Sequence, residues 1–499
     1  MDVNSAVWTV PARAREFGFF VDGQWAEAGD RPMSERKSPA HGVAVTRTVR
    51  CTKADIDYAV GVARAAFEDR RWSGLPGGER ASVLLKAAAG IRARVEELAL
   101  LESLESGKPI GQALGEIEGG ANIFEYAAGA ARALHGDAFN NLGDKMLGLV
   151  TREPIGVVGL ITPWNFPFFI LSERVPFILA AGCTIVSKPS EVTSATTLLL
   201  AEILSDAGLP DGVFNVVTGS GTEIGQALAE HADVDMISFT GSTAVGRSVL
   251  LASAGNFKKV GLELGGKNPQ VVFADANLDE AADGVVFGIC FNAGQCCVGG
   301  SRLVVEKSVA AEFEALVSAK MARVRIGDPL DPNTQMGAIV TAAQNATILG
   351  YIEAGKREGA RLVCGGEAYP SDAGQFVRPT VFADVTREMS IASEEIFGPV
   401  LTISTFETFD EAMAIANDTI YGLAASIWTS NLDKATDAFR RIRAGRVWVN
   451  TTINNGPELP LGGFKQSGTG REAGIYGVEE YTEVKATHIA LGRREPWVS

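Results

Sequence analysis

Two adjacent cysteines stand in the segment FNAGQCCVGGSR, residues 291–302. Free cysteines are usually small buried residues, but the flanking glycines disfavour an ordinary core position for Cys296 and Cys297. A thiol can also act as a nucleophile when its thiolate is stabilised. The four histidines of the chain have no chemically suggestive neighbours: His41, His135, His231 and His488. A reactive cysteine would therefore depend on backbone amides, a cofactor charge or water activated by a carboxylate.

Two other segments hold polar side chains that could assist such a nucleophile. LELGGK places Glu263 in an apolar run before two glycines, and burial gives a carboxylate the raised pKa that a general base needs near neutral pH. PWNFP fixes Asn165 between aromatic residues and prolines, as an oxyanion donor requires. Each has a plainer alternative, because Glu263 could cap a turn and Asn165 could belong to a rigid aromatic corner.

Two glycine-rich segments suggest a ligand that bears phosphate. GSGTEIG, residues 219–225, follows an expected strand and opens an expected helix, where a phosphate-binding turn belongs. An ordinary tight turn explains it equally well. GSTAVGRS, residues 241–248, has the spacing of a nucleotide-binding P-loop but carries Arg247 in place of the lysine. A nucleotide hydrolase is therefore disfavoured, and the amides at this helix start suit a dinucleotide pyrophosphate.

The segment KPSE ends another expected strand and places Lys188 and Glu191 at the edge of a sheet. Ligands of parallel sheets bind at that edge, although a surface ion pair is the alternative. A carboxylate there could bind the ribose hydroxyls of adenosine and would repel a 2′-phosphate, which favours NAD over NADP.

The composition is that of a folded globular protein. The 499 residues suggest two or three domains, with 46% hydrophobic and 21% charged residues. A net charge of −15 without a basic run disfavours nucleic acid and membranes as partners. The six cysteines form no C-x-x-C pair, so we expect no metal site. Because the first residues lack the order of a signal peptide, we expect a cytoplasmic protein.

The elements that must position these residues alternate between strands and helices. Residues 154–276 contain the β-rich runs IGVVGLITP, GCTIVSKPS, GVFNVVTGS, MISFTGS and KVGLELGGKNPQVVFADA, which indicates a parallel sheet covered on both faces. The pattern begins again after residue 277 with SRLVVEK, PVLTISTF and GRVWVN, and predicts a second α/β domain. Residues before about 130 are predicted to be largely helical and to pack onto the first domain.

The motifs PWNFP, KPSE, FTGS, LELGGK, GQCC and EEIFGPV, in this order, resemble those of the aldehyde dehydrogenase superfamily over nearly the whole chain. The resemblance implies an α/β fold with a Rossmann-like, parallel-sheet dinucleotide-binding domain at 1–131 and 154–266. It further implies an α/β catalytic domain at 267–466 and a small β extension at 132–153 and 480–499. That extension pairs subunits, so a homodimer or homotetramer is expected.

The same resemblance implies a covalent mechanism for oxidation of an aldehyde to a carboxylate. Cys297, two places after the glutamine of GQCC, is the expected nucleophile, and Cys296 is a neighbour able to form a vicinal disulfide. Asn165 and the backbone amide of Cys297 would hold the oxyanion, while Glu263 would activate the water that hydrolyses the thioester. Relatives that transfer the acyl group to coenzyme A typically lack this glutamate. Glu472 resembles a second carboxylate that relays protons.

The resemblance also assigns residues to the two ligands. For the cofactor, NAD in preference to NADP, it implies Trp164, Lys188, Glu191, Gly221, Gly225, Phe239, Gly241, Ser242, Glu395 and Phe397. For the substrate pocket it implies Phe166, Ile170, Glu173, Cys296, Val298, Asn455 and Leu461.

Two of these positions depart from the family pattern and suggest the substrate. Glu173 replaces a tryptophan or a carboxylate-binding arginine, and the segment around Asn455 is polar where many relatives are apolar. Together with Glu458 they favour a polar, cationic aldehyde. The alternatives are that Glu173 pairs with Arg174 or another cation, that the substrate is a neutral aliphatic, aromatic or semialdehyde compound, or that the chain is a non-catalytic paralogue.

Overall fold

The computed structural model describes residues 7–494 and 496–498. Residues 1–6 of the predicted dinucleotide-binding domain and residues 495 and 499 of the predicted oligomerisation extension lie outside this range. None of the described helices has the length and hydropathy needed to cross a membrane.

The first sheet has eight strands in the order β20-β12-β11-β8-β9-β10-β2-β3. Its central strands run parallel, which confirms the predicted Rossmann-like α/β class. They are β8 (Val157–Ile161), β9 (Thr184–Lys188), β10 (Phe214–Val216), β11 (Met236–Thr240) and β12 (Lys259–Glu263). The outer strands pair antiparallel and are β2 (Phe19–Val21), β3 (Gln24–Ala26) and β20 (Gly468–Thr469).

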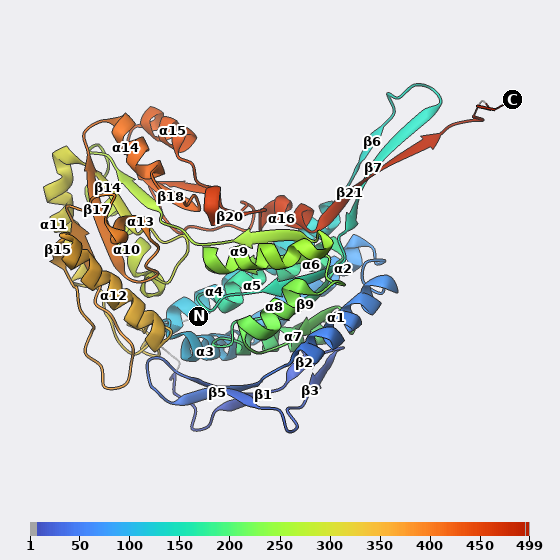
Figure 1. The fold of residues 1–499 in the computed structure, drawn as a ribbon, viewed down its shortest axis with the longest axis horizontal. Coiled ribbons are helices and arrows are strands. Elements are labelled where there is room, and N and C mark those ends of the chain that lie inside the picture. Colours follow the sequence, from blue (N-terminus) through green and yellow to red (C-terminus); the bar gives the residue numbers. More distant parts are fainter. Residues whose placement is uncertain (1–6, 495, 499) are drawn as a thin grey trace.

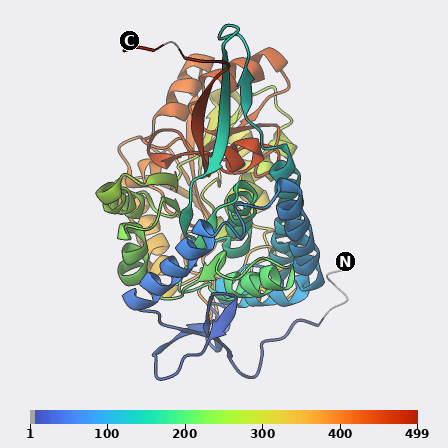
Figure 2. The same ribbon diagram turned by 90° about the vertical axis from the view of Figure 1, so that its right-hand side faces the viewer.

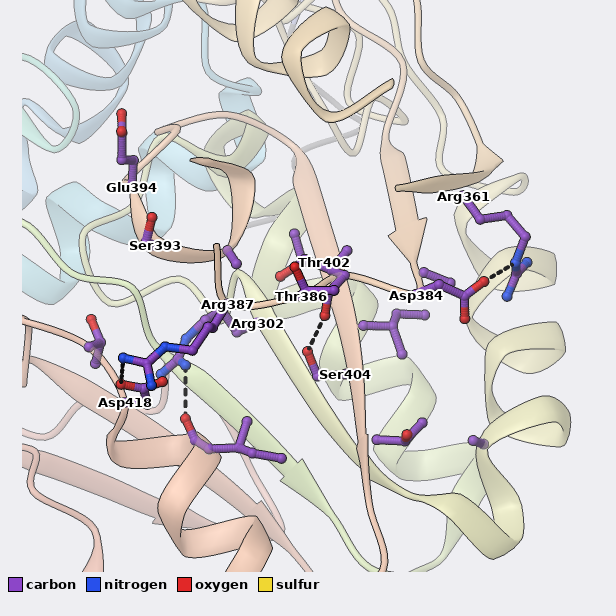
Figure 3. Close-up of a pocket in the computed structure, with 18 of the residues that line it drawn as sticks. Arg302, Arg361, Asp384, Thr386, Arg387, Ser393, Glu394, Thr402, Ser404 and Asp418 are labelled. Carbon is purple, nitrogen blue, oxygen red and sulfur yellow. Dashed lines mark hydrogen bonds and ion pairs between the residues drawn. The ribbon is translucent and has the colours of Figure 1, made fainter. Parts of the chain in front are cut away.

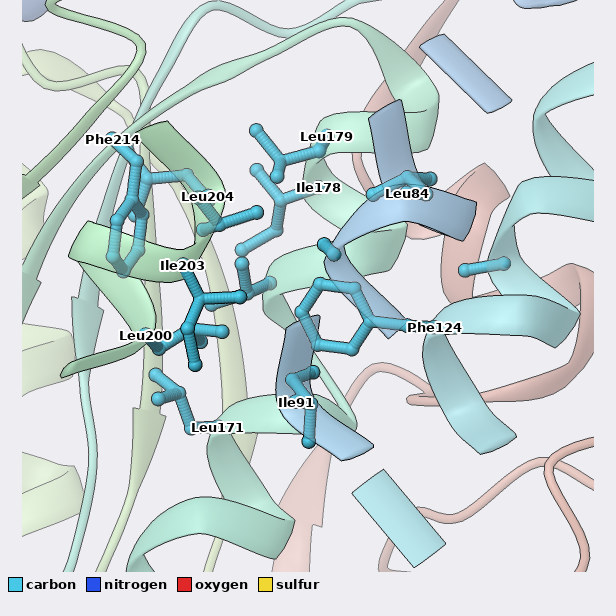
Figure 4. Packing of buried hydrophobic residues seen from close by; sticks show 14 of the residues in the cluster. Leu84, Ile91, Phe124, Leu171, Ile178, Leu179, Leu200, Ile203, Leu204 and Phe214 are labelled. Carbon is cyan, nitrogen blue, oxygen red and sulfur yellow. The ribbon is translucent and has the colours of Figure 1, made fainter. Parts of the chain in front are cut away.

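Helices cover both faces of this sheet because successive strand residues point to opposite sides. Val158 faces a core with α2–α7, whereas its neighbour Val157 faces a core with α1, α8 and α9. Figure 4 shows side chains from several helices of the first core meeting in one apolar layer. The helices are α1 (Lys53–Glu68), α2 (Gly77–Ala93), α3 (Val95–Ser106), α4 (Ile110–Ala133), α5 (Pro167–Ser172), α6 (Val175–Ala181), α7 (Ala195–Asp206), α8 (Gln226–Glu230) and α9 (Thr243–Ala252).

The prediction that the N-terminal part is largely helical is wrong for the first 50 residues, which form strands. Helices do fill residues 53–133, but five short strands precede them. β2 and β3 form a hairpin whose two-residue turn, Asp22 and Gly23, has positive φ at both positions. Asp-Gly is a strong signal for such a turn, so the hairpin was readable from the sequence. The other three strands pair as β1-β5-β4 and are β1 (Arg15–Phe17), β4 (Met33–Lys37) and β5 (Ala44–Val49).

The second sheet has seven strands in the order β15-β16-β17-β14-β13-β18-β19. The strands are β13 (Pro269–Val272), β14 (Arg302–Glu306), β15 (Arg361–Cys364), β16 (Thr380–Ala383), β17 (Val400–Phe406), β18 (Ala424–Trp428) and β19 (Arg446–Val449). Its helices are α10 (Leu278–Cys290), α11 (Ala310–Met321), α12 (Ala342–Glu358), α13 (Ser390–Ser393), α14 (Phe409–Asn417) and α15 (Leu432–Arg441). Helices α10–α12 pack on one face and α14–α15 on the other, so this is the predicted second α/β unit.

A three-stranded antiparallel sheet projects from the body of the molecule (Figures 1 and 2). It consists of β6 (Asp137–Phe139), β7 (Met146–Pro154) and β21 (Thr482–Ala490), and α16 (Gly474–Glu480) leads into it. Short 3₁₀ or π turns complete the chain: η2 (Gly221–Gly225), η3 (Ser253–Asn256), η4 (Phe291–Gly294), η5 (Lys307–Val309) and η6 (Lys465–Ser467). The projecting strands fall where the oligomerisation extension was predicted.

Candidate active site

The carboxyl ends of adjacent parallel strands bring the predicted motifs together. Thr240 ends β11 and lies opposite Glu263, which ends β12. PWNFP follows β8, the other neighbour of β11. After Glu263 the chain leaves the first sheet through residues 264–268 and enters the second sheet at β13. The site therefore lies where the two sheets are joined.

Cys297 lies where two cavities meet. One cavity, of about 310 Å³, extends past Trp164, Gly241 and Glu395, and the other, of about 450 Å³, extends past Phe166 and Glu173. Among the described residues, Cys297, Thr240 and Leu264 line both. This thiol is half-buried, whereas the neighbouring Cys296 is buried and faces only the larger cavity. The structure thus gives the two cysteines different surroundings.

Side-chain amides hold the loop that carries Cys297. The Nδ2 of Asn268 donates to the carbonyl oxygens of Cys297 at 2.7 Å and Gly299 at 2.9 Å, and its Oδ1 accepts from the amide of Ala424. The Nδ2 of Asn165 donates to the carbonyl of Gln295 at 3.1 Å. Since that nitrogen carries two hydrogens, Asn165 retains a second donor for an oxyanion. Sequence reasoning missed Asn268, although it follows the LELGGK motif directly.

Glu263 has the environment expected of a general base. It is buried, lines the larger cavity, and its Oε1 has no hydrogen-bond partner among the described residues. Burial raises the pKa of Glu263 to about 8, while Arg174 opposes the rise and Glu472 adds to it. A carboxylic acid with this pKa changes its charge within the neutral range, as general-base catalysis requires.

Glu472 lies behind the cavities instead of lining them. The hydroxyl of Tyr481 donates to its Oε2 at 3.0 Å, and the Nε of Arg174 lies 3.5 Å from its Oε1. Arg174 itself lines the larger cavity and is buried. Glu472 is therefore connected to the cavity through Arg174, and no direct bond joins it to Glu263 among the described residues. Its assignment as a proton relay stays a prediction.

The surroundings of Cys297 favour the neutral form of its thiol. Burial raises its pKa well above the ordinary value, and the nearby Cys296 and Glu395 add to the rise. None of the four histidines lines either cavity. That a reactive cysteine lacks a histidine base stays a prediction. Formation of the thiolate would require a positive charge or a proton acceptor near Cys297, and the carboxylate of Glu263 lines the same cavity.

The smaller cavity collects half of the residues predicted to bind the cofactor: Trp164, Gly241, Ser242, Glu395 and Phe397. The rings of Trp164 and Phe397 meet edge to face at 5.3 Å. Glu395 accepts a hydrogen bond from the amide of Gly266 at 2.9 Å and lies against Gly265, where a Cβ atom would come within 2.2 Å of its Oε2. Only glycine permits this approach.

The remaining predicted cofactor residues do not line the smaller cavity. Lys188 is buried, and the aliphatic part and amino group of its side chain lie close to Gly225 and Gly221. Glu191 is exposed three residues later. The ring of Phe239 lies against Gly241, and the Ser242 hydroxyl accepts from the amide of Val245 as the N-cap of α9.

The larger cavity contains every residue predicted for the substrate pocket: Phe166, Ile170, Glu173, Cys296, Val298, Asn455 and Leu461. Glu458 does not line it. Helix α4 supplies a wall that sequence reasoning missed, made of Gly111, Gln112, Gly115, Glu116 and Gly119. No motif marks this wall, because its residues reach the cavity only through the packing of α4 against α5.

A still larger cavity, of about 1060 Å³, lies on the second α/β unit away from Cys297 (Figure 3). Two of its arginines already form ion pairs: Arg361 with Asp384 at 2.7 Å and Arg387 with Asp418 at 3.2 Å. None of the predicted site residues lines it. Size alone therefore does not locate the chemistry.

Comparisons with known proteins agree with this geometry. The aldehyde dehydrogenase family profile matches residues 25–487. Betaine aldehyde dehydrogenase of Bacillus subtilis (strain 168) is 41% identical over 470 residues, 93% of this chain and 96% of that protein. The crystal structure of an NAD-dependent aldehyde dehydrogenase from Sinorhizobium meliloti is 52% identical, with a TM-score of 0.96 over 97% of this chain and 96% of that one.

A mutant of the P. syringae indole-3-acetaldehyde dehydrogenase AldA, in complex with NAD⁺ and IAA, is 42% identical, with a TM-score of 0.94 over 96% of this chain and 98% of that one. The chain belongs to the aldehyde dehydrogenase family and is an aldehyde-oxidising oxidoreductase. This assignment excludes the alternative that the chain is a P-loop nucleotide hydrolase.

Proposed function

We propose that this chain oxidises a polar aldehyde to the carboxylate with NAD, through a covalent adduct on Cys297. The observation that carries the proposal is the position of this thiol where a glycine-lined cavity and a substrate-sized cavity meet. A nucleophile at that junction can reach a carbonyl in one cavity while a cofactor fills the other.

The residues of the smaller cavity fit a nicotinamide dinucleotide. Glycines at 241 and 265 leave room for close approach, and the N-terminus of α9 offers backbone amides to a pyrophosphate. Glu395 would hold a ribose, Phe397 would pack beside the ring, and Lys188 with Glu191 would meet the adenosine ribose. When bound, NAD supplies the hydride acceptor and a positively charged ring. The exposed carboxylate of Glu191 supports NAD over NADP, because it would repel a 2′-phosphate.

The chain's own residues would act in two stages. The Cys297 thiol passes its proton to water, its Sγ bonds to the aldehyde carbon as the carbonyl π bond breaks, and the oxyanion receives hydrogen bonds from the free donor of Asn165 and the amide of Cys297. After oxidation to the thioester, Glu263 takes a proton from water as that water attacks the same carbon. The carbon–sulfur bond then breaks, the carboxylate leaves, and the thiol is restored.

Glu173 supports the proposal of a polar or cationic substrate. Its carboxylate lines the larger cavity, so it is open to a ligand, although Arg174 lies 4.0 Å away and Arg446 is also near. The Nη1 of Arg174 also donates to the carbonyl of Ile170 at 3.0 Å, so this nitrogen is shared between Glu173 and the backbone.

The test is a kinetic comparison that follows NADH by absorbance. Wild-type protein should oxidise an amino-aldehyde and a trimethylammonio-aldehyde with higher kcat/KM than succinic semialdehyde or an alkanal of equal length. Cys297→Ser should abolish NADH formation, whereas Cys364→Ser is the matched control, because this second half-buried cysteine lies on β15 outside both cavities. Equal activity of the two variants would refute the role of Cys297.

A separate arm addresses the substrate charge. Glu173→Gln should raise KM for the cationic aldehydes and leave KM for the alkanal nearly constant. An unchanged KM for the cationic aldehydes would remove the charge argument while the family assignment stands.

We also propose that the chain forms a homodimer or homotetramer. The projecting strand β21 carries exposed Val484 and Ile489, and α9 with the turn after it exposes Leu251 and Phe257. Large apolar side chains exposed on a surface favour contact with another protein. Mass photometry of the wild type and of Leu251→Glu should show a loss of higher species in the variant.

A further inference from the structure

We propose that Asn292 is a positioning residue that fixes the oxyanion donor Asn165 against the loop that carries Cys297. The inference rests on the proposed function and deepens it, because it names a residue on which the chemistry depends from outside the ligand cavities. Asn292 is 3% exposed and lines neither of the two cavities that meet at Cys297. Any effect of this side chain on the reaction must therefore pass through its neighbours.

The side-chain amide of Asn292 bridges two loops of the site. Its Nδ2 donates to the carbonyl of Asn165 at 2.8 Å and to the carbonyl of Gln295 at 3.2 Å. An amide nitrogen carries two hydrogens, so this bridge uses both. The carbonyl of Gln295 also accepts from the Nδ2 of Asn165 at 3.1 Å. The carbonyl that orients the side chain of Asn165 is thus itself held by Asn292.

The bridge connects the two α/β units of the chain. Asn165 follows β8 of the first sheet, whereas Asn292 and Gln295 shortly precede Cys297 in the second unit. The two proposed oxyanion donors come from opposite sides of this junction, yet both must lie about 2.7–3.1 Å from one oxygen atom. A misplacement of about 1 Å can cost about 100-fold in rate. A fixed distance between residues 165 and 295 is therefore a condition for stabilising the oxyanion.

Gln295 gives the bridge a firm base in the second unit. Its Oε1 accepts from the amide of Val340 at 2.9 Å, and its Nε2 donates to the carbonyl of Asn292 at 3.1 Å. Gln295 is 1% exposed. Buried polar groups that satisfy one another rigidify the structure around them, so the position that Asn292 imposes on Asn165 is well defined.

The backbone at Asn292 offers a plainer explanation for this residue. Asn292 and Ala293 have φ of 50° and 54°, and Gly294 follows with φ of 73°. This left-handed conformation is unfavourable for most residues, and asparagine tolerates it better than others. The side chain could therefore serve the turn alone. Because glycine adopts positive φ freely, Asn292→Gly keeps the turn, removes the bridge and separates the two explanations.

The first test compares two reagents that modify the thiol of Cys297. p-Nitrophenyl acetate is attacked at its carbonyl carbon, passes through an oxyanion and releases p-nitrophenolate. Iodoacetamide loses iodide from a saturated carbon and forms no oxyanion. The ratio of the acylation rate in the first turnover to the alkylation rate therefore reports on the oxyanion donors, and changes in thiolate fraction cancel. Cys297→Ser measures the reaction at other groups, which is subtracted.

Asn292→Gly should lower this ratio at least about tenfold, since loss of a whole oxyanion donor costs about 10²–10³-fold. Ala293→Gly is the matched control and should leave the ratio unchanged, because Ala293 is also buried at positive φ but has no side-chain donor. Calorimetry serves as the check on folding. Asn292→Gly should bind NAD with the wild-type Kd, since Asn292 does not line the smaller cavity.

The second test asks whether Asn292 acts through Asn165. Asn165→Ala should lower the ratio about 10²–10³-fold, and the double variant should lower it no further, because the donor to be positioned is already gone. A ratio unchanged by Asn292→Gly, a further loss in the double variant, or loss of NAD binding by Asn292→Gly would each overturn the inference. Equally fast release of p-nitrophenolate by wild type and Cys297→Ser would instead overturn the proposed function.

Discussion

The ionisation of Glu263 should control the rate of thioester hydrolysis. Its pKa of about 8 means that the basic form is a minority at neutral pH. By the titration relation, about 1% is ionised at pH 6, about 10% at pH 7 and about half at pH 8. Hydrolysis should therefore accelerate roughly 50-fold between pH 6 and pH 8, and only about twofold above that range.

Glu263→Gln keeps the shape of the side chain and removes the base. General-base catalysis typically contributes a factor of about 10²–10⁴, so hydrolysis should slow by that factor and lose its pH dependence between pH 6 and pH 8. Formation of the thioester uses Cys297 and Asn165, and should continue.

The assay follows the acyl adduct on Cys297 directly. The protein is mixed with NAD and excess aldehyde, quenched at intervals in buffers from pH 6 to pH 9, and weighed as an intact chain by mass spectrometry. The Gln variant should accumulate the adduct, while wild type should do so only at low pH. A wild-type hydrolysis rate that is flat from pH 6 to pH 8, or a Gln variant that forms no adduct, would refute the reasoning.

Three further expectations concern the segment that joins the two sheets. Asn268→Ala removes the hydrogen-bond partner of three backbone groups, the carbonyls of Cys297 and Gly299 and the amide of Ala424, at a cost of about 1–3 kcal/mol each. We therefore expect urea unfolding to show a loss of at least about 3 kcal/mol in stability, and iodoacetamide to alkylate Cys297 at an altered rate. Unchanged stability would contradict this. Gly265→Ala should raise KM for NAD more than tenfold through displacement of Glu395, whereas an unchanged KM would show that this contact is dispensable. Between about pH 4.5 and pH 8, Glu263 keeps its proton in the folded protein and has lost it in the unfolded chain, so the free energy of unfolding falls as the pH rises. Glu263→Gln should remove up to about 1.4 kcal/mol of this fall per pH unit. Parallel curves of unfolding free energy against pH for the two proteins would count against a raised pKa.

The sequence predicted site residues that follow strands better than site residues that reach the cavities through the packing of helices. Glu263, Asn165 and Gly241 stand at or just after the carboxyl ends of adjacent strands, so the rule for parallel sheets places them together. Cys297 and Glu395 belong to the second α/β unit, and the family resemblance, not local pattern, connected them to the first. The structure brings all of these residues to the walls of two adjoining cavities.

Residues outside the motifs could not be placed in the same way. Gly115 precedes Cys297 by more than 180 positions, and only the packing of α4 on α5 brings it to the same cavity. Arg174 belongs to no motif either, and its contact with Glu472 depends on the packing of α6 against α16. The hairpin at Asp22 is different, because its turn signal was present in the sequence and was not used.

The segment Leu264–Asn268 has a consequence for how the protein can move. Within five residues it follows the base Glu263, contacts Glu395 through Gly266, and anchors the carbonyl of Cys297 through Asn268. Rotation of one domain against the other about this connection would disturb base, cofactor contact and nucleophile together. In the proposed mechanism, a rotation that opens one domain against the other about this segment would therefore separate the groups that carry out the reaction. In the proposed function, the aldehyde and the carboxylate travel through the larger cavity and the dinucleotide through the smaller one, so the rates of entry and exit would depend on the side chains that line these two cavities.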